Sequence, residues 1–160
     1  MWLSRIKWYK VVSNLKIMKL LLSFFSLLLI GISAFSQNSI ESKGIDYLEN
    51  GKYRKAIKQF TKALKFEKDS CEIYYNRGNA YFDLEKYSKA IIDYSNAIMI
   101  NAEYIDAYTN RGAAYGRLKM YFEARNDYDL VLKVEPKNDV IYYNRGLDYY
   151  DAGEYQKAVD

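Results

Sequence analysis

Residues 71–104 read CEIYYNRGNAYFDLEKYSKAIIDYSNAIMINAEY, and residues 105–138 read IDAYTNRGAAYGRLKMYFEARNDYDLVLKVEPKN. These adjacent stretches are each 34 residues long and share tyrosine, Asn-Arg-Gly and alanine positions in one register. Each glycine is followed three residues later by a tyrosine and nine residues after that by an alanine, and the glycines are Gly44, Gly78, Gly112 and Gly146. A 34-residue period of this kind predicts a solenoid of helix–turn–helix units.

The recurring small and aromatic residues have a packing reason. Glycine and alanine let two antiparallel helices approach closely, while the tyrosines, with Phe60 in the first unit, fill the space between that pair and the next helix. Tyrosine suits this position because its ring buries a large area while its hydroxyl can still reach water. We therefore expect most of the 18 tyrosines to be core residues and not a platform on which nucleic-acid bases stack.

The phased columns resemble the tetratricopeptide repeat, and the resemblance covers about 124 of the 160 residues. It implies an all-α fold, an α-solenoid of stacked helix–turn–helix pairs that form a right-handed superhelix. It divides residues 37–160 into units at 37–70, 71–104 and 105–138 and an incomplete fourth unit at 139–160, after a leader at residues 1–36. The turn inside each unit is expected at residues 50–52, 84–86, 118–120 and 152–154.

The leader has the layout of a secretory signal peptide. From Met18 the chain reads MKLLLSFFSLLLIGISAFSQ, a lysine followed by an apolar run and then by small residues. Ala34 and Ser36 would lie three and one positions before a cut ahead of Gln37, so we predict cleavage there. The alternative is an uncleaved membrane anchor formed by residues 20–35, which is shorter than the roughly 20 residues that a bilayer span needs. Both interpretations place the repeats across the inner membrane, in the periplasm or associated with the envelope.

The composition argues against several classes of function. Five of the 24 basic residues and none of the 20 acidic residues lie in residues 1–36, so residues 37–160 carry 19 bases and 20 acids. That balance lacks the clustered positive charge that nucleic-acid binding needs. The sequence has no histidine and a single cysteine, Cys71, which excludes zinc sites and histidine-based catalytic triads within the chain. We expect no cofactor, no metal site and no catalysis, and we assign Cys71 no role.

In tetratricopeptide repeat proteins, the first helices of the units line an inner groove that usually takes an extended peptide or a partner's helix. The matching positions of this chain predict a partner-binding groove that includes Tyr75, Asn76, Asn79, Asp83, Asp106, Asn110, Arg117, Tyr143, Asn144 and Asp151. The acidic side chains on this face favour a neutral or mildly basic partner segment.

Asparagine recurs at one position of this groove and is followed each time by arginine. The three pairs are Asn76–Arg77, Asn110–Arg111 and Asn144–Arg145. Because an amide both donates and accepts hydrogen bonds, such an asparagine ladder could hold an extended backbone without reading its sequence. The alternative is that these asparagines and arginines bond to neighbouring helix ends and acids of the same protein.

Some members of the family bind the C-terminal carboxylate of chaperones through a clamp of lysine, arginine and asparagine. The asparagine positions of that clamp are matched here by Asn76, or by Asn79 with Asn110. The lysine positions are instead occupied by Glu41 or Tyr75 and by Asp106 or Val140. We therefore expect the groove to repel an acidic chaperone tail.

These features favour an exported, non-catalytic scaffold that binds a partner protein or peptide in its groove. The partner is not expected to be nucleic acid, and contact with a membrane is expected only through the leader. The alternative is the N-terminal docking or sensory part of a longer envelope enzyme or regulator. That alternative arises because the fourth unit stops at Asp160, inside its second helix, and we expect the natural chain to continue.

Overall fold

The computed structural model describes residues 18–20, 22–24, 26 and 40–159, and the chain divides into two units at residue 39. Residues 18–20, 22–24 and 26 are helical and exposed. The rest of the leader, including the cleavage site expected before Gln37 and the remainder of the alternative anchor, lies outside the described residues. Within the helices that are described, none has the length and apolar character needed to cross a membrane.

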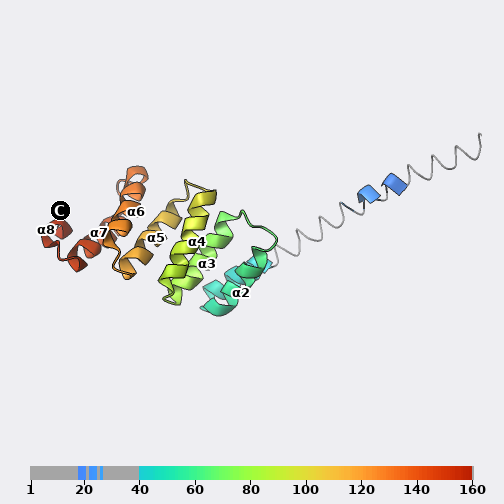
Figure 1. Ribbon diagram of the computed structural model, residues 1–160, viewed down its shortest axis with the longest axis horizontal. Helices are drawn as coiled ribbons and strands as arrows, with labels where there is room; N and C mark the ends of the chain where they lie inside the picture. The colour runs from blue at the N-terminus through green and yellow to red at the C-terminus, as the bar shows by residue number, and fades with distance from the viewer. Residues whose placement is uncertain (1–17, 21, 25, 27–39, 160) are drawn as a thin grey trace, which may run out of the picture. The chain divides into compact units, whose positions relative to one another are not determined.

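The second unit is built from helices, and residues 40–159 contain no strand. A helical stretch at residues 40–49 is followed by α2 (Tyr53–Ala63), α3 (Cys71–Asp83), α4 (Tyr87–Ile100), α5 (Ile105–Arg117), α6 (Tyr121–Val134), α7 (Asp139–Asp151) and α8 (Tyr155–Val159). Figure 1 shows α2 to α8 following one another along the unit in chain order, and each helix contacts the next. The predicted all-α solenoid of helix–turn–helix pairs is confirmed.

Close approach of the paired helices explains the glycine column. A Cβ on Gly78 would lie 2.7 Å from the Tyr94 ring, and a Cβ on Gly112 would lie 2.6 Å from the Tyr128 ring. Both tyrosines are 1% exposed, so each ring fills the space that the glycine of the paired helix leaves. A side chain at either glycine would displace a buried ring, as expected for an interior packed at crystal-like density.

The turn inside each unit places a left-handed residue at the same point of the repeat. Gly51 and Gly153 have φ angles of 68° and 78°, while Glu85 and Lys119 adopt 58° and 61°. Glycine takes this conformation without steric cost, whereas a residue with a Cβ is strained in it. All four residues fall inside the predicted turn segments, so the sequence located these turns correctly.

The tyrosines differ between the middle units and the last one. Tyr94 of α4 and Tyr128 of α6 are buried, as predicted. On α7 and α8, by contrast, Tyr143, Tyr150 and Tyr155 are 66%, 61% and 62% exposed. The prediction that tyrosines form the core is therefore right for Tyr94 and Tyr128, while most tyrosines of the first three units are partly buried against the core. It is wrong for most tyrosines of the fourth unit, which have no further helix packed over them among the described residues.

Candidate partner-binding groove

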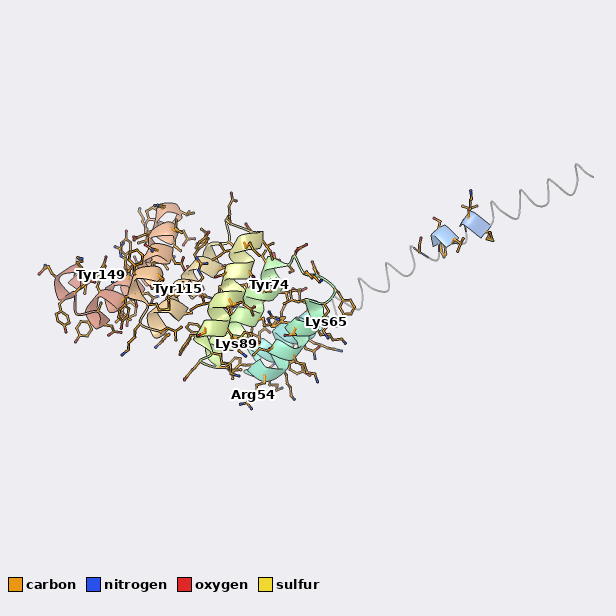
Figure 2. All side chains as sticks on the ribbon, in the orientation of Figure 1. Arg54, Lys65, Tyr74, Lys89, Tyr115 and Tyr149 are labelled. Carbon is orange, nitrogen blue, oxygen red and sulfur yellow. The ribbon has the colours of Figure 1, made fainter. Side chains whose placement is uncertain are left out.

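The first helix of each unit carries the predicted groove residues. Helix α5 contacts both α3 and α7, so these first helices are neighbours in space although a whole second helix separates them in sequence. Tyr74, Tyr115 and Tyr149 mark the three helices in Figure 2. Of the ten predicted groove residues, four lie on α3, three on α5 and three on α7.

Two pockets open along these helices. The first groove pocket, of about 290 Å³, is lined by Leu48, Asn79, Phe82, Asp83, Tyr94 and Asn110. The second groove pocket, of about 150 Å³, is lined by Phe82, Ala113, Gly116, Arg117, Tyr128, Asn144, Leu147, Asp148 and Asp151. Six of the ten predicted residues therefore line a pocket. The four that line neither pocket are Tyr75, Asn76, Asp106 and Tyr143.

The two pockets are related by the 34-residue repeat. Each residue of the first pocket has its equivalent, 34 positions later, in the second: Leu48 and Phe82, Asn79 and Ala113, Phe82 and Gly116, Asp83 and Arg117, Tyr94 and Tyr128, Asn110 and Asn144. They are equivalent sites on successive unit interfaces. Differences between them therefore come from their side chains.

Hydrogen bonds within the chain tie together the polar groups of the first pocket. Asn79 Oδ1 accepts a bond from the Tyr94 hydroxyl at 2.8 Å and another from Asn110 Nδ2 at 2.9 Å. Asn110 Nδ2 also donates to the Tyr75 hydroxyl at 3.1 Å. Burial raises the pKa of Tyr94 and of Tyr75, so both hydroxyls are neutral partners in this network. The bonds join α3 to α4 and α5.

The second pocket lacks the equivalent network because Ala113 stands where the first unit interface has Asn79, and Thr109 stands where it has Tyr75. Neither the Tyr128 hydroxyl nor the Asn144 side chain makes a hydrogen bond within the part of the chain that the structure describes. Burial, with the nearby Asp148 and Asp127 carboxylates, raises the pKa of Tyr128, so this hydroxyl is also protonated. The substitution leaves a hydroxyl and an amide available to a ligand.

Asp148 adds a buried carboxyl to the second pocket. It is 7% exposed, and its Oδ2 has no hydrogen-bond partner among the described residues. Gly116 makes room for it, since a Cβ there would lie 2.6 Å from Asp148 Oδ1. Burial raises the pKa of Asp148 to about 6, although the Arg125 guanidinium opposes this shift, and Asp151 adds to it. Asp148 and Tyr128 are the two buried residues of the pocket lining.

Arg125 of α6 attracts the Asp148 carboxylate without forming a hydrogen bond to it. Its guanidinium lies 4.6 Å from the centre of the Tyr149 ring, and its Nη1 lies 3.5 Å from Glu154 Oε1. Like Asp148 Oδ2, Arg125 Nη1 is buried and lacks a hydrogen-bond partner in residues 40–159. The carboxyl of Asp148 is therefore only partly neutralised by its own protein.

Sequence reasoning missed this pair, for which the register held only a weak signal. Both residues break a column that is apolar in the two preceding units. Asp148 replaces Ala80 and Ala114, and Arg125 replaces Ile57 and Ile91. The alanines of that column are fully buried, but Asp46 holds the same position in the first unit and is exposed, so the register alone does not predict a buried charge.

The arginines that follow the asparagines have a structural role. Arg77 donates through Nε and Nη2 to the two carboxylate oxygens of Asp93 at 2.7 and 2.8 Å, and through Nη1 to Thr61 at 3.1 Å. Arg111 binds Asp127 in the same two-bond geometry at 2.8 and 2.7 Å. Asp93 and Asp127 are 2% and 4% exposed. For these two arginines, the alternative of bonding within the protein is correct.

The three asparagines of the ladder are not equivalent. Asn110 belongs to the hydrogen-bond network of the first pocket. Asn76 and Asn144 are half-buried, and their side chains make no hydrogen bond with the other described residues. The ladder therefore has one member that is bonded internally and two whose amides are free.

The described residues hold no group of three or more histidine, cysteine or acidic side chains that could bind a metal ion. Cys71 is buried and its thiol is free. Burial, together with the Glu72 carboxylate, raises the pKa of this thiol.

Stacked helical hairpins with a groove along their first helices define a helical-repeat interaction protein. Profiles of the TPR repeat match residues 44–84 and 78–119, and the tetratricopeptide repeat profile matches residues 105–138. The matches span residues 44–138, more than half of the sequence. The chain therefore belongs to the tetratricopeptide repeat family.

Solved structures of the same fold include peptide complexes. The crystal structure of MamA is similar with a TM-score of 0.73 and 28% identity, covering 77% of this chain and 72% of that one. The first TPR of Spaghetti (RPAP3) bound to the HSP90 peptide SRMEEVD is similar with a TM-score of 0.68 and 32% identity, covering 73% and 95%. The second TPR domain of human RPAP3 in complex with the HSP70 peptide SGPTIEEVD is similar with a TM-score of 0.68 and 28% identity, covering 72% and 96%. A search of curated proteins gave no match. The chain is thus an interaction scaffold that resembles peptide-binding TPR domains.

Proposed function

We propose that this chain is an exported, non-catalytic scaffold that holds an extended segment of a partner protein in the groove along α3, α5 and α7. The observation that carries the proposal is the second groove pocket. There the Tyr128 hydroxyl, the Asn144 amide and Asp148 Oδ2 have no hydrogen-bond partner among the described residues. Because buried polar groups are almost always hydrogen-bonded, the unpaired buried Asp148 Oδ2, with two further unbonded groups in the same pocket, supports a role in binding.

The charge of the groove favours a neutral or mildly basic partner segment. Asp83, Asp106 and Asp151 are exposed on the first helices, and Arg117 is the exposed base among the residues that line the two pockets. The peptides bound by the RPAP3 domains end in Glu-Glu-Val-Asp. A segment of that kind would meet carboxylates here, so we propose that the partner is not an acidic tail. The near-neutral repeats likewise argue against nucleic acid.

The free amides of the ladder fit the same role. Asn76 and Asn144 can each donate to and accept from a passing backbone, whereas the Nδ2 of Asn110 is already bonded to Asn79 and Tyr75. We propose that Asn76 and Asn144 hold the partner backbone and that Asn110 shapes the groove. Replacing all three by alanine should weaken capture of the partner while circular dichroism stays helical.

Export is proposed from the layout of the leader, which resembles a signal peptide. Alkaline phosphatase folds to an active form only outside the cytoplasm, so its fusion after residue 160 should be active. The intact mass of the purified native protein should then match a chain that starts at Gln37. A mass that retains residues 1–36 would instead support the membrane anchor, and an inactive fusion would contradict export.

Photo-crosslinking tests the scaffold role in the native cell. Benzoyl-phenylalanine in place of Leu147, which lines the second groove pocket, is compared with the same probe in place of Lys133, an exposed residue of the second helix α6. We expect one discrete adduct from Leu147, with the crosslinked peptide mapping to a non-acidic segment, and none from Lys133. The same adducts from both positions, or none from Leu147, would overturn the proposal.

A further inference from the structure

We infer that the second groove pocket is an anchor subsite that takes one basic side chain of the partner, a lysine ammonium or an arginine guanidinium. The inference rests on the proposed scaffold function and names the chemistry of its partner at one point of the groove. It is carried by the buried, unpaired carboxyl of Asp148, beside the Tyr128 hydroxyl and the Asn144 amide, which line the same pocket without a bond to the described chain, and it does not follow from the acidic residues of the rim alone.

The acceptors of the pocket match the donors of a basic side chain. Asp148 and Asp151 supply carboxylate oxygens, Asn144 supplies an amide oxygen, and Tyr128 supplies a hydroxyl oxygen. An ammonium carries three N–H donors and a guanidinium carries five, and neither carries an acceptor. A ligand of that type can satisfy several of these groups at once. The volume of about 150 Å³ is many times the roughly 10–15 Å³ that holds one water molecule, so the pocket has room for a side chain.

The charges around the pocket disfavour an acidic ligand. Asp148 and Asp151 face it from α7, and Arg117 faces it from α5. From α6, Tyr128 contributes a neutral hydroxyl, while Arg125 lies beside Asp148 but is shared with Glu154 and the Tyr149 ring. Arg117 is exposed, whereas Asp148 is 7% exposed and loses most of its hydration. The buried charge is therefore the one that needs a counter-charge.

The first groove pocket provides an internal comparison. It is the same site one repeat earlier, yet Asn79 already uses the Tyr94 hydroxyl and Asn110, and the position of Asp148 is held there by Ala114. The first pocket has one carboxylate, that of the exposed Asp83. It lacks a buried charge, so we expect no comparable binding of a basic side chain there.

A fluorescently labelled peptide tests the inference with the full 160-residue chain. The probe is nine residues of serine and glycine with a single central lysine, compared with the same peptide carrying arginine, glutamine or glutamate in that place. Fluorescence anisotropy gives the affinity of each. We expect the lysine or the arginine peptide to bind about tenfold more tightly than the glutamine peptide, which is typical of a hydrogen bond to a buried charge. Equal binding of the glutamine peptide, tighter binding of the glutamate peptide, or no binding would contradict the inference.

Charge-matched variants locate the effect. Asp148→Asn removes the buried charge and should abolish the preference for the basic peptide, while Asp83→Asn changes the net charge equally in the first pocket and should leave the preference unchanged. Circular dichroism verifies that both variants fold. Loss of the preference in both variants would show that the general negative charge of the groove attracts the peptide. The inference of a subsite at Asp148 would then be wrong.

The pH profile separates binding from a merely structural role. Since the pKa of Asp148 is about 6, protonation between pH 7.5 and pH 5 should reduce the affinity for the lysine peptide about tenfold, while the Asp148→Asn variant should show a flat profile. A profile that is the same in both proteins would contradict the inference. If the groove crosslinks its partner from Leu147 but the peptide preference is absent, the subsite fails while the scaffold function stands.

Discussion

The two groove pockets occupy the same place in successive repeats, and the comparison shows how a repetitive fold acquires a particular site. In the first pocket Asn79 accepts bonds from Tyr94 and Asn110, so the polar groups are bonded to one another. In the second pocket an alanine at the equivalent position leaves the Tyr128 hydroxyl free. The backbone is common to both, so side-chain differences, Ala113 for Asn79 and Thr109 for Tyr75, determine whether the pocket bonds internally or presents its groups to a ligand.

The largest expected effect concerns the buried ion pairs that recur in the second and third repeat units. Arg77→Ala and Arg111→Ala each remove the partner of a buried aspartate, Asp93 or Asp127, and each should lower the free energy of unfolding by about 3 kcal/mol. Urea denaturation measures both values.

Arg145→Ala is the matched control for these two arginines. Arg145 pairs at 3.0 Å with Asp129, whose side chain is 57% exposed, so its loss should cost less than about 1 kcal/mol. An equally large loss for Arg145→Ala would show that exposure does not distinguish these ion pairs.

Asp148 should make the fourth unit less stable as the pH rises. Its pKa in the folded protein is about 6, above the ordinary value for aspartate, so between these values the folded state keeps a proton that the unfolded state has lost. Stability from this group is therefore present at about pH 4 and is lost as the pH rises to about 6 and above. Asp148→Asn should stabilise the protein by about 2 kcal/mol at pH 7.5 and by little at pH 4.

Urea denaturation at the two pH values checks this prediction. Asp151→Asn removes a charge from an exposed position of the same helix and should change stability by less than about 0.5 kcal/mol at both pH values. An Asp148→Asn variant that is less stable than the parent at pH 7.5 would mean that the carboxylate is stabilised within the fold.

Exchanging the residues at the equivalent positions 79 and 113 should make the hydrogen bonding of each pocket more like that of the other. Asn79→Ala takes an acceptor from the buried Tyr94 hydroxyl and from Asn110, and it should cost about 1.5 kcal/mol. Ala113→Asn should supply that acceptor to Tyr128 and Asn144 in the second pocket and weaken binding of the lysine peptide several-fold. Denaturation and anisotropy measure the two effects. Unchanged peptide affinity in Ala113→Asn would indicate that these two groups do not contact the ligand.

The smallest expected effect lies in the turns between the two helices of the second and third units, which each contain a left-handed residue with a side chain. Glu85→Gly and Lys119→Gly each remove the backbone strain of a residue in the left-handed conformation. Each should raise the free energy of unfolding by about 0.5 kcal/mol, because the greater freedom of glycine in the unfolded chain offsets part of the gain. Denaturation midpoints with an unchanged urea dependence measure this gain. A loss of stability in either variant would show that its side chain contributes more than the strain costs.

Much of the fold could be predicted from the sequence because the 34-residue register repeats local physics. The glycine column reports close helix approach, and the turn segments contain the left-handed residues Gly51 and Gly153. The groove is assigned to the first helices from the resemblance to tetratricopeptide repeats, and it stays a prediction. What the register could not supply was the tertiary pairing of individual side chains within that groove.

The asparagine ladder illustrates this limit. Asn110 and Asn144 are identical in register, yet their bonding differs because Asn110 meets Asn79 and Tyr75, whereas the equivalent residues for Asn144 are Ala113 and Thr109. Asp148 was missed for a different reason, since an aspartate at the same position of the first unit, Asp46, is exposed. In this chain the repeated columns define the scaffold, and the breaks in those columns define the candidate site.

Nuclear magnetic resonance of the side-chain amides tests the difference between the two pockets most directly. The lysine peptide is added to the full chain while the Nδ2 signals of Asn144 and Asn110 are followed in one spectrum. We predict a saturable shift of the Asn144 signals and unmoved Asn110 signals. A shift at Asn110, or none at Asn144, would contradict the assignment of the second groove pocket as the anchor for a basic side chain.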